Sequence, residues 1–272
     1  MTRAPRFPVA LDSVQRSDRT GSVGTVLRPQ RLLQQAADAA RVQASGRAAP
    51  SGLGLDSAAV RQRMVQRLRA EGVRPEAVLQ AFGQVERHLF VDSALAPQAY
   101  EDTSLPIGLQ QTISKPSVVA HMLALLFEGE LARSRGHLGR MLEIGTGCGY
   151  QAALLALLGS SLVSIERLKV LHDKARHQLA GRSACDVRLV FGDGRLGHPP
   201  RAPYDSIVAA AGGDEVPNAW LDQLAEGGRL VAPVHDAVHG VQSLWVIDRQ
   251  PGGLRRRRHD AVHFVPLKSG IE

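Results

Sequence analysis

The segment EIGTGCGY, residues 143–150, carries glycines at every second position: Gly145, Gly147 and Gly149. It follows the apolar run MLEI and precedes the apolar run QAALLALL, which predict a buried strand and a helix. Glycines at such a turn let the backbone bend sharply and let a ligand approach without Cβ atoms in the way. The spacing indicates a cofactor site, and a tight turn that binds nothing is the plainer alternative.

Two cofactors are compatible with a glycine turn at this place. A dinucleotide favours the pattern GxGxxG, whereas S-adenosylmethionine sites commonly show an acidic residue before a GxGxG turn. Here Glu143 precedes the turn, and Tyr150 stands where the dinucleotide pattern has its third glycine. The spacing therefore favours S-adenosylmethionine.

Acidic residues end the next two predicted strands. Glu166 can accept hydrogen bonds from ribose hydroxyls, as the acid in NAD enzymes also does. Asp193, between Gly192 and Gly194, can accept one from an adenine amino group. The alternatives are a helix N-cap for Asp193 and a surface ion pair for Glu166. Together with the glycine turn, these strand ends predict a cofactor cleft at the carboxyl edge of a sheet.

The elements that would hold these residues alternate along the second half of the chain. Strands that are apolar throughout and separated by helices are typical of a parallel sheet covered on both faces, which predicts a doubly wound, mostly parallel, Rossmann-like α/β fold. Two further runs flank PGG without a helix between them and predict a closing antiparallel hairpin. The predicted strands are 140–144, 161–165, 186–190, 205–210, 228–234, 242–248 and 261–267, with helices near 151–158, 168–180 and 217–225.

The region before the sheet is predicted to be helical at both ends. A first helix begins near Ser57 and stops at Gly72, and a second short helix follows Pro75. Residues 100–116 indicate a polar loop, after which helical periodicity resumes at Pro116.

Charge is unevenly distributed over the chain. Residues 1–50 hold eight arginines and three aspartates, so +5 of the net +7 falls there. Their low apolar periodicity predicts a solvated extension over 1–55 followed by one domain over 56–272, while an RNA- or membrane-contacting tail and a transit-like leader stay open. The apolar runs are too short to span a membrane, so a cytoplasmic protein is expected.

The segment YEDTSLPIGLQQTISKPSVVAHM, residues 100–122, resembles the protein-L-isoaspartate O-methyltransferases, which carry YxDxxLPIGxGQTISxPxxVAxM before their glycine turn. The resemblance continues through ERHLFV, LEIGTGCGYQAA, the GDG turn, RAPYDSIV, QLAEGGRLVAPV and VHFVPL, and so covers residues 57–269. The matching positions in the first segment are Tyr100, Asp102, Leu105, Pro106, Ile107, Gly108, Gln111, Thr112, Ile113, Ser114, Pro116, Val119, Ala120 and Met122.

This resemblance implies a class I S-adenosylmethionine-dependent methyltransferase fold and a protein repair reaction. A methyl group moves to the free α-carboxylate of an L-isoaspartyl residue in a damaged protein or peptide, and the ester closes to a succinimide that reopens partly to aspartate. A carboxylate with a pKa near 3.5 is already ionised at neutral pH, so no general base is needed. Orientation is the remaining task, and it can lower the barrier by about 7–11 kcal/mol.

Roles for individual residues also follow from the resemblance. Ser114, two residues before Pro116, is expected to orient the carboxylate beside a helix start whose free N–H groups attract anions, and a plain N-cap is the alternative. The other predicted substrate residues are Ile107, Gly108, Thr112 and Val265, the last in a strand over 262–267. The predicted cofactor residues are Gln111, Thr112, Ile113, Glu143, Gly145, Thr146, Gly147, Cys148, Glu166, Arg167, Gly192, Asp193 and Gly194.

Four positions depart from the family pattern. Gln110 replaces a glycine and would narrow or stiffen the substrate loop, and Lys115 adds either a positive charge near the bound carboxylate or a solvated side chain. Arg195 and Ala210 replace a usual tryptophan and threonine. These changes are expected to affect peptide affinity more than cofactor chemistry.

Other signals receive plainer interpretations. His235 and His239 are not on a clear helix, so no metal site is predicted. Arg255 to Arg258 would alternate faces on an exposed strand and discourage sheet-to-sheet pairing. Cys148 fills a small-residue position rather than acting as a nucleophile.

The sequence leaves two other functional classes open. A nucleic-acid methyltransferase should show a base-accepting motif such as NPPY, whereas the fourth strand leads into IVAAAGGDEVP. A non-catalytic binding module would keep the fold and lose affinity for the methyl donor. We expect a monomer that acts on isoaspartyl proteins and binds neither membranes nor nucleic acid.

Overall fold

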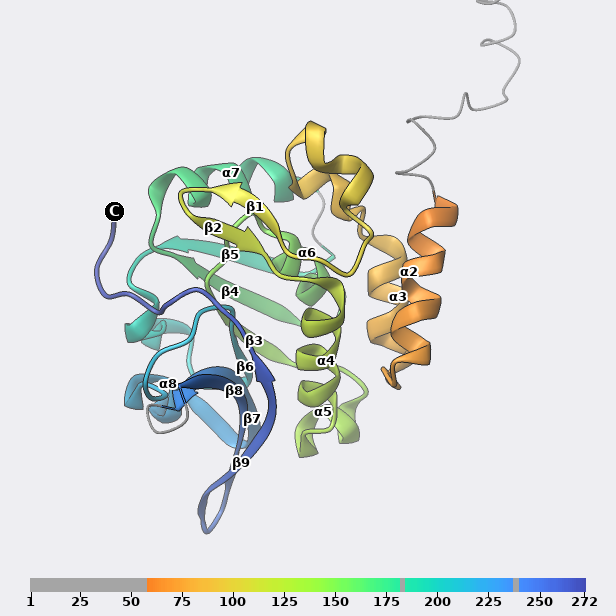
Figure 1. Cartoon of the computed structure of the whole chain (residues 1–272). Coiled ribbons are helices and arrows are strands. Elements are labelled where there is room, and N and C mark those ends of the chain that lie inside the picture. The colour runs from red at the N-terminus through yellow and green to blue at the C-terminus, as the bar shows by residue number, and fades with distance from the viewer. Residues whose placement is uncertain (1–57, 182–183, 237–239) are drawn as a thin grey trace, which may run out of the picture. The chain divides into compact units, whose positions relative to one another are not determined.

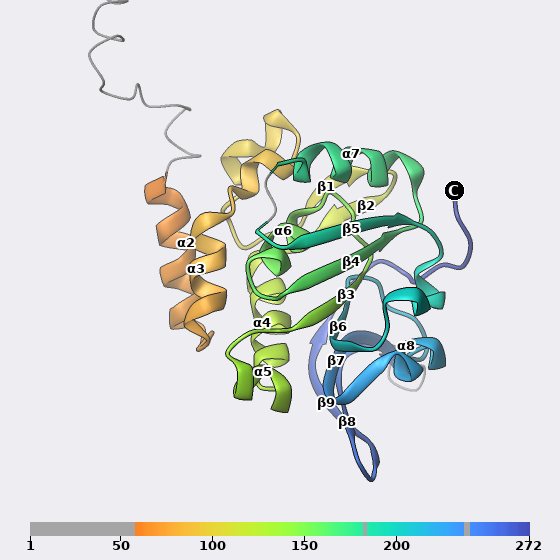
Figure 2. The ribbon, with the colours of Figure 1, turned by 180° about the vertical axis from the view of Figure 1, so that it is seen from behind.

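The computed structural model describes residues 58–181, 184–236 and 240–272 of the chain, so the predicted extension over 1–55 lies outside the described residues. Its centre is a seven-stranded sheet in the order β5-β4-β3-β6-β7-β8-β9, seen from opposite sides in Figures 1 and 2. The strands are β3 (Arg140–Ile144), β4 (Ser161–Glu166), β5 (Asp186–Phe191), β6 (Tyr204–Ala209), β7 (Leu224–Asp236), β8 (Val241–Gln250) and β9 (Gly253–Val262).

The pairing directions confirm the predicted fold class. Strands β5, β4, β3, β6 and β7 are parallel, and β7, β8 and β9 pair in antiparallel fashion. The chain enters the sheet at β3, winds outward through β4 to β5, and then returns to the other side of β3 as β6. The carboxyl ends of β3 and β6 therefore form a switch point, where parallel α/β sheets leave a crevice for ligands.

Apolar residues of the same strand reach opposite faces of the sheet, which explains why the predicted strands are apolar throughout. Met141 and Leu162 pack with helices α4 (Pro116–Phe127), α6 (Tyr150–Ala156) and α7 (Lys169–Leu179). Their neighbours Leu142 and Val163 join the opposite cluster, which includes Trp220 of α8 (Asn218–Asp222).

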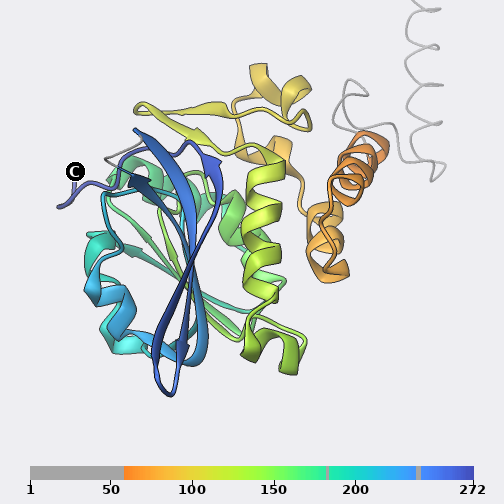
Figure 3. The ribbon, with the colours of Figure 1, turned by 60° about the horizontal axis from the view of Figure 1, so that its bottom comes forward.

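Two predicted boundaries at the carboxyl-terminal end of the chain are wrong. The last strand is Gly253–Val262, not 261–267, because it begins at the last glycine of the PGG turn and carries the four arginines. Beyond it, the Gln242 side chain bonds the backbone N–H and carbonyl of Phe264, and Pro266 has no N–H for a ladder. Figure 3 shows the long twisted β8–β9 hairpin, with β9 at the sheet edge.

The expected helix over 217–225 is also too long. The structure has the helix α8 only over Asn218–Asp222, and β7 begins at Leu224, which pairs with Tyr204. Gly227, two residues beyond the expected end, adopts φ +75°, a conformation that a helix does not contain.

The region before the sheet contains one feature that the sequence did not predict. The expected helices form as α2 (Ala58–Ala70), α3 (Glu76–Gln84) and α4, and α5 (Glu130–Arg135) follows. The expected loop over 100–116 instead contains an antiparallel hairpin, β1 (Leu105–Gly108) and β2 (Gln111–Ile113). Alternate residues Leu105 and Ile107 are buried, so the hairpin has a core-facing side.

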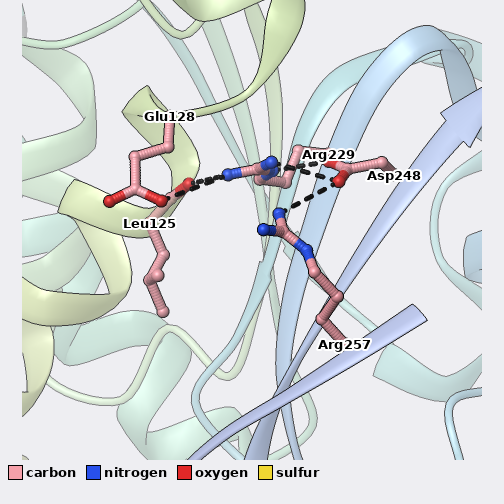
Figure 4. A network of polar contacts seen from close by, with 5 residues as sticks. All are labelled: Leu125, Glu128, Arg229, Asp248 and Arg257. Atoms are coloured by element: carbon pink, nitrogen blue, oxygen red, sulfur yellow. Dashed lines mark hydrogen bonds and ion pairs between the residues drawn. The ribbon is translucent and has the colours of Figure 1, made fainter. Parts of the chain in front are cut away.

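A buried ion pair connects α4 to the antiparallel end of the sheet. Arg229 on β7 donates two hydrogen bonds to Asp248 on β8, at 2.6 and 3.1 Å, and a third to the carbonyl of Leu125 at 2.7 Å. Arg257 on β9 also bonds Asp248, at 3.2 Å, as Figure 4 shows. Among the described helices, none is long and apolar enough to cross a membrane.

Candidate active site

The glycine turn between β3 and α6 requires its glycines. Gly145, Gly147 and Gly149 have φ of +89°, +55° and +91°, in the left-handed region that side chains disfavour. A Cβ on Gly147 would also lie 3.2 Å from the side chain of Ile107. The bare backbone therefore fits both the turn and a close approach of the β1–β2 hairpin.

Glu143 lies beneath this turn and is completely buried. Its Oε2 accepts a hydrogen bond from the hydroxyl of Ser164, which in turn contacts the hydroxyl of Thr146 at 2.6 Å. Burial raises the pKa of Glu143 to about 8. Its Oε1 has no hydrogen-bond partner among the described residues, so one acceptor is available behind the turn.

Glu166 supports the glycine turn from the neighbouring strand. Its Oε2 accepts from the N–H of Gly147 at 2.8 Å, and its Oε1 accepts from the N–H of Leu168 at 2.9 Å. The side chain borders the cavity and forms no ion pair among the described residues, so the surface ion-pair alternative is wrong. A carboxylate oxygen has room for a second donor, which leaves ribose binding as a prediction.

Asp193 behaves differently from the expectation that it faces adenine. Its Oδ1 caps the following turn by accepting from the N–H of Arg195 at 2.9 Å, so the N-cap alternative is correct. Its Oδ2 accepts from the N–H of Gly270 at 2.7 Å. Asp193 and Gly192 do not line the cavity, whereas Gly194 does.

One cavity at the carboxyl ends of β3, β4 and β6 collects most of the predicted site. The remaining predicted members, Gly108, Glu143, Gly192 and Asp193, lie beside or behind its wall. The predicted residues that line it are Ile107, Gln111, Thr112, Ile113, Ser114, Gly145, Thr146, Gly147, Cys148, Glu166, Arg167, Gly194 and Val265.

The β1–β2 hairpin turns through residues that are unusual for its geometry. Leu109 and Gln110 adopt φ of +52° and +58°, and positive φ at both central residues is the pattern of a type I′ turn, which favours Asn-Gly. Gln110, which departs from the family's glycine, therefore occupies a position where a side chain costs about 1–2 kcal/mol.

Ser114 lines the cavity and does not cap the following helix. The N-cap of α4 is Lys115, which forms no side-chain cap, so the N-cap alternative for Ser114 is wrong. Asp102 binds the helix start instead, through the N–H and the hydroxyl of Ser117, both at 2.8 Å. Because Pro116 has no N–H and that of Ser117 is occupied, the helix start offers less to an anion than predicted.

The buried Arg87 joins the segment before the β1–β2 hairpin to the start of α6, and sequence reasoning assigned it no role. Arg87 is 0% exposed, and its guanidinium donates to the carbonyls of Ala99 at 2.7 Å and Thr103 at 3.4 Å. The guanidinium carbon also lies 4.9 Å from the ring centre of Tyr150, the first residue of α6. The matching motif ERHLFV was the only signal for it in the sequence.

The positions that depart from the family pattern have identifiable contacts. Lys115 lies 3.7 Å from Asp102, so it forms an ion pair rather than being fully solvated. Ala210 borders the cavity beside Gly145. Close to Arg195, the indole of Trp220 donates to the carbonyl of Gly194 at 2.8 Å, so a tryptophan reaches this turn from α8.

Cys148 and His235 have the following surroundings in the structure. Burial raises the pKa of the Cys148 thiol, which keeps it protonated and poorly nucleophilic. His235 lies 3.7 Å from Asp214, while His239 lies outside the described residues. The described part of the chain contains no cluster of three or more potential metal ligands.

Sequence reasoning missed part of the cavity wall. Leu168 and Leu171 at the start of α7 line it, as do Gln151 of α6 and Lys268. Leu168 directly follows the predicted Glu166–Arg167 pair, so its position was a usable signal. Nothing local marks Lys268, because only the path of the chain after β9 brings it to the cleft.

These residues fit a sulfonium nucleoside. The glycine turn presents bare backbone at Gly145 and Gly147 to the cavity, and behind it Glu143 offers an acceptor without a partner among the described residues. A model of the family described as Protein-L-isoaspartate(D-aspartate) O-methyltransferase matches residues 59–272. The chain belongs to this methyltransferase family.

Known proteins support the family assignment along most of the chain. The Protein-L-isoaspartate O-methyltransferase of Methylibium petroleiphilum is 58% identical over 270 residues, covering 99% of this chain and 97% of the relative. That of Leptothrix cholodnii is 56% identical over 274 residues, with coverage of 98% and 95%. The predicted resemblance and enzyme class are thereby confirmed.

Solved structures agree on the fold. A structure named protein-L-isoaspartate O-methyltransferase has a TM-score of 0.68 and 27% identity, covering 78% of this chain and 67% of that one. A Plasmodium falciparum structure described under the same enzyme name, in complex with S-adenosyl-L-homocysteine, has a TM-score of 0.62 and 22% identity, with coverage of 76% and 97%. The predicted class I methyltransferase fold is confirmed, and the cofactor of this family is S-adenosylmethionine.

Proposed function

We propose that the protein methylates the free α-carboxylate of L-isoaspartyl residues in damaged proteins and peptides, using S-adenosylmethionine. One observation carries the proposal: Ser114 and Ile107 of the substrate segment line the same cavity as the glycine turn. The family assignment supports the reaction class.

The chain's own residues account for the chemistry that such a transfer needs. S-adenosylmethionine, when bound, supplies a methyl group on a positively charged sulfur. The acceptor carboxylate is ionised at neutral pH, so no residue has to take a proton. The hydroxyl of Ser114, which has no hydrogen-bond partner among the described residues, donates to one carboxylate oxygen and holds the other in line with the methyl group.

Apolar walls complete the site. Ile107, Ile113 and Val119 line the cavity and are each at most 8% exposed, so they limit the access of water. A drier site strengthens the attraction between the incoming carboxylate and positive charge. Cytoplasmic location and a monomeric state belong to the same proposal.

Parallel assays separate this function from its rivals. We expect radiolabel from S-adenosylmethionine to enter an isoaspartyl peptide but neither the matching aspartyl peptide nor bulk RNA. Label in RNA would indicate a nucleic-acid methyltransferase. Binding of S-adenosylhomocysteine without any transfer would indicate a binding module.

The role of Ser114 has its own test. Ser114→Ala removes a hydrogen bond to a charged group, worth about 1.5–3 kcal/mol, so kcat/KM for an isoaspartyl peptide should fall about 10- to 100-fold. The Kd of S-adenosylhomocysteine, measured by calorimetry, should stay within about twofold. Ser134→Ala, on the exposed face of α5, is the matched control. Wild-type transfer by Ser114→Ala would remove the orienting role.

A further inference from the structure

The segment after β9 crosses the mouth of the candidate cofactor cleft. It runs from the end of β9 past the carboxyl ends of the parallel strands to the side of β4 and β5 (Figure 1). Val265, Pro266, Leu267 and Lys268 line the cavity on the way. The segment is held in register by a bridge between Gly212 and Pro266.

Its last residues are fastened at two separate places. At the first, the N–H of Gly270 donates to Asp193, at the end of β5, over 2.7 Å. At the second, Glu272 is bound to the loop after β4: its carboxylate lies 2.8 Å from the guanidinium of Arg167, and its N–H donates to the Arg167 carbonyl at 2.8 Å. The Glu272 carbonyl accepts from the N–H of Lys169 at 2.7 Å and so caps the start of α7.

The second attachment point borders the part of the cleft expected to hold the adenosine, and the first, at Asp193, lies next to Gly194 of the cavity wall. Arg167 and Leu168 line the cavity, and the N–H of Leu168 binds Glu166, the predicted ribose ligand. Fastening Glu272 to Arg167 and Lys169 therefore also fixes the backbone that orients Glu166. The segment therefore borders the cleft on the side of Arg167 and Leu168.

We propose that residues 268–272 form a strap that retains the nucleoside end of the cofactor, and that Glu272 is the positioning residue that fastens it. The inference rests on the proposed function, because it concerns the same cofactor site. The strap opens to let the cofactor enter and the demethylated product leave. We call the Arg167–Glu272 ion pair the latch of this strap. Opening begins at the latch, because the Glu272 side chain is 72% exposed.

If the same contacts instead kept the cofactor out, weakening them would have the opposite effect on cofactor affinity. Gly270 occupies the Asp193 oxygen that was expected to receive an adenine amino group. If the segment blocked the site rather than closing over a bound cofactor, weakening its latch would tighten cofactor binding. The sign of the effect therefore decides between retention and blockage.

The experiment loosens the latch in the full-length protein. In Glu272→Gln, we expect S-adenosylhomocysteine to dissociate about fivefold faster, the factor that an exposed ion pair can supply, with a matching rise in Kd by calorimetry. High salt should accelerate dissociation from the wild type and have less effect on the variant, because the ion pair is screened. The control is Glu226→Gln, at an exposed glutamate on β7 that has no bonded partner in the described part of the chain.

Further readouts separate positioning from a general loss of structure. The variant should keep the melting temperature of the wild type without ligand, raise the KM for S-adenosylmethionine, and leave kcat unchanged or higher. Bound S-adenosylhomocysteine should protect the amides of residues 268–272 from hydrogen exchange in the wild type. An unchanged or slower dissociation rate in Glu272→Gln overturns the strap, whereas failure of the wild type to bind S-adenosylhomocysteine overturns the proposed function itself.

Discussion

Glu143 lies behind the glycine turn and does not line the cofactor cavity. The acid that marked the glycine turn in the sequence does not touch the cavity, and it is held by Ser164 beneath the turn. Burial disfavours its charged form and raises its pKa to about 8, which favours the protonated form near neutral pH. A positively charged group of the cofactor near the turn would favour its ionised form.

This shift makes stability depend on pH. A carboxyl whose pKa is higher in the folded state binds its proton more tightly there, so its contribution to stability is full below about pH 4.5 and is lost as the pH rises to about 8. In Glu143→Gln we expect that loss to disappear, so the melting temperature of the variant should rise relative to the wild type across this window. Thermal unfolding at half-unit pH steps measures it, with exposed Glu101→Gln as the control. A constant difference between variant and wild type contradicts the assignment.

At the scale of elements, the start of α4 is built by a residue far from it in the sequence. Asp102 accepts both donors of Ser117 and lies 3.7 Å from Lys115, so it joins the segment before β1 to the helix after Ser114. The β1–β2 hairpin is thereby held at both of its ends, although its own turn carries Gln110 in a strained conformation. The position of Ser114 depends on this attachment.

Replacing Asp102 should weaken both the helix and the substrate site. Asp102→Ala leaves the helix start uncapped, so we expect a loss of about 1–2 kcal/mol in urea unfolding and a higher KM for the isoaspartyl peptide. Asp92→Ala removes a similar cap from a short exposed turn and should change the peptide KM little. Burial raises the pKa of Asp102, but the bonds from Ser117 outweigh it and hold the pKa below its usual range. Its contribution should therefore vanish as the pH falls through that lowered pKa.

The whole described domain depends on polar contacts that cross its layers. Arg229 joins β7 to β8 and to the last turn of α4, where it satisfies the carbonyl of Leu125. Figure 4 shows that Asp248 receives Arg229 and Arg257 together. The antiparallel end of the sheet is therefore attached to the helix that begins beside Ser114.

Replacing the buried Arg229 should lower the stability of the fold. Arg229 is 6% exposed, so Arg229→Ala leaves Asp248 with only Arg257 and should lower the free energy of unfolding by about 3 kcal/mol. Arg255→Ala, on the exposed part of β9, should change it by less than about 0.5 kcal/mol. Urea unfolding of both variants provides the measurement, and equal losses would show that the ion pair adds nothing beyond surface charge.

The sequence by itself determined the winding of the sheet, the glycine turn and the cofactor cleft, because strand patterns and positive-φ glycines are local properties of the chain. A local pattern also placed Glu166 at the cleft, and the family resemblance of residues 100–122 placed Ser114 there. Only the tertiary structure decided that Asp102 caps α4, that Asp193 binds Gly270 instead of facing the cavity, and that Glu272 binds the backbone of Arg167 and Lys169. Each of these contacts joins residues remote in sequence, so its partner is chosen by the order of the strands and the path of the connecting segments rather than by any neighbour along the chain.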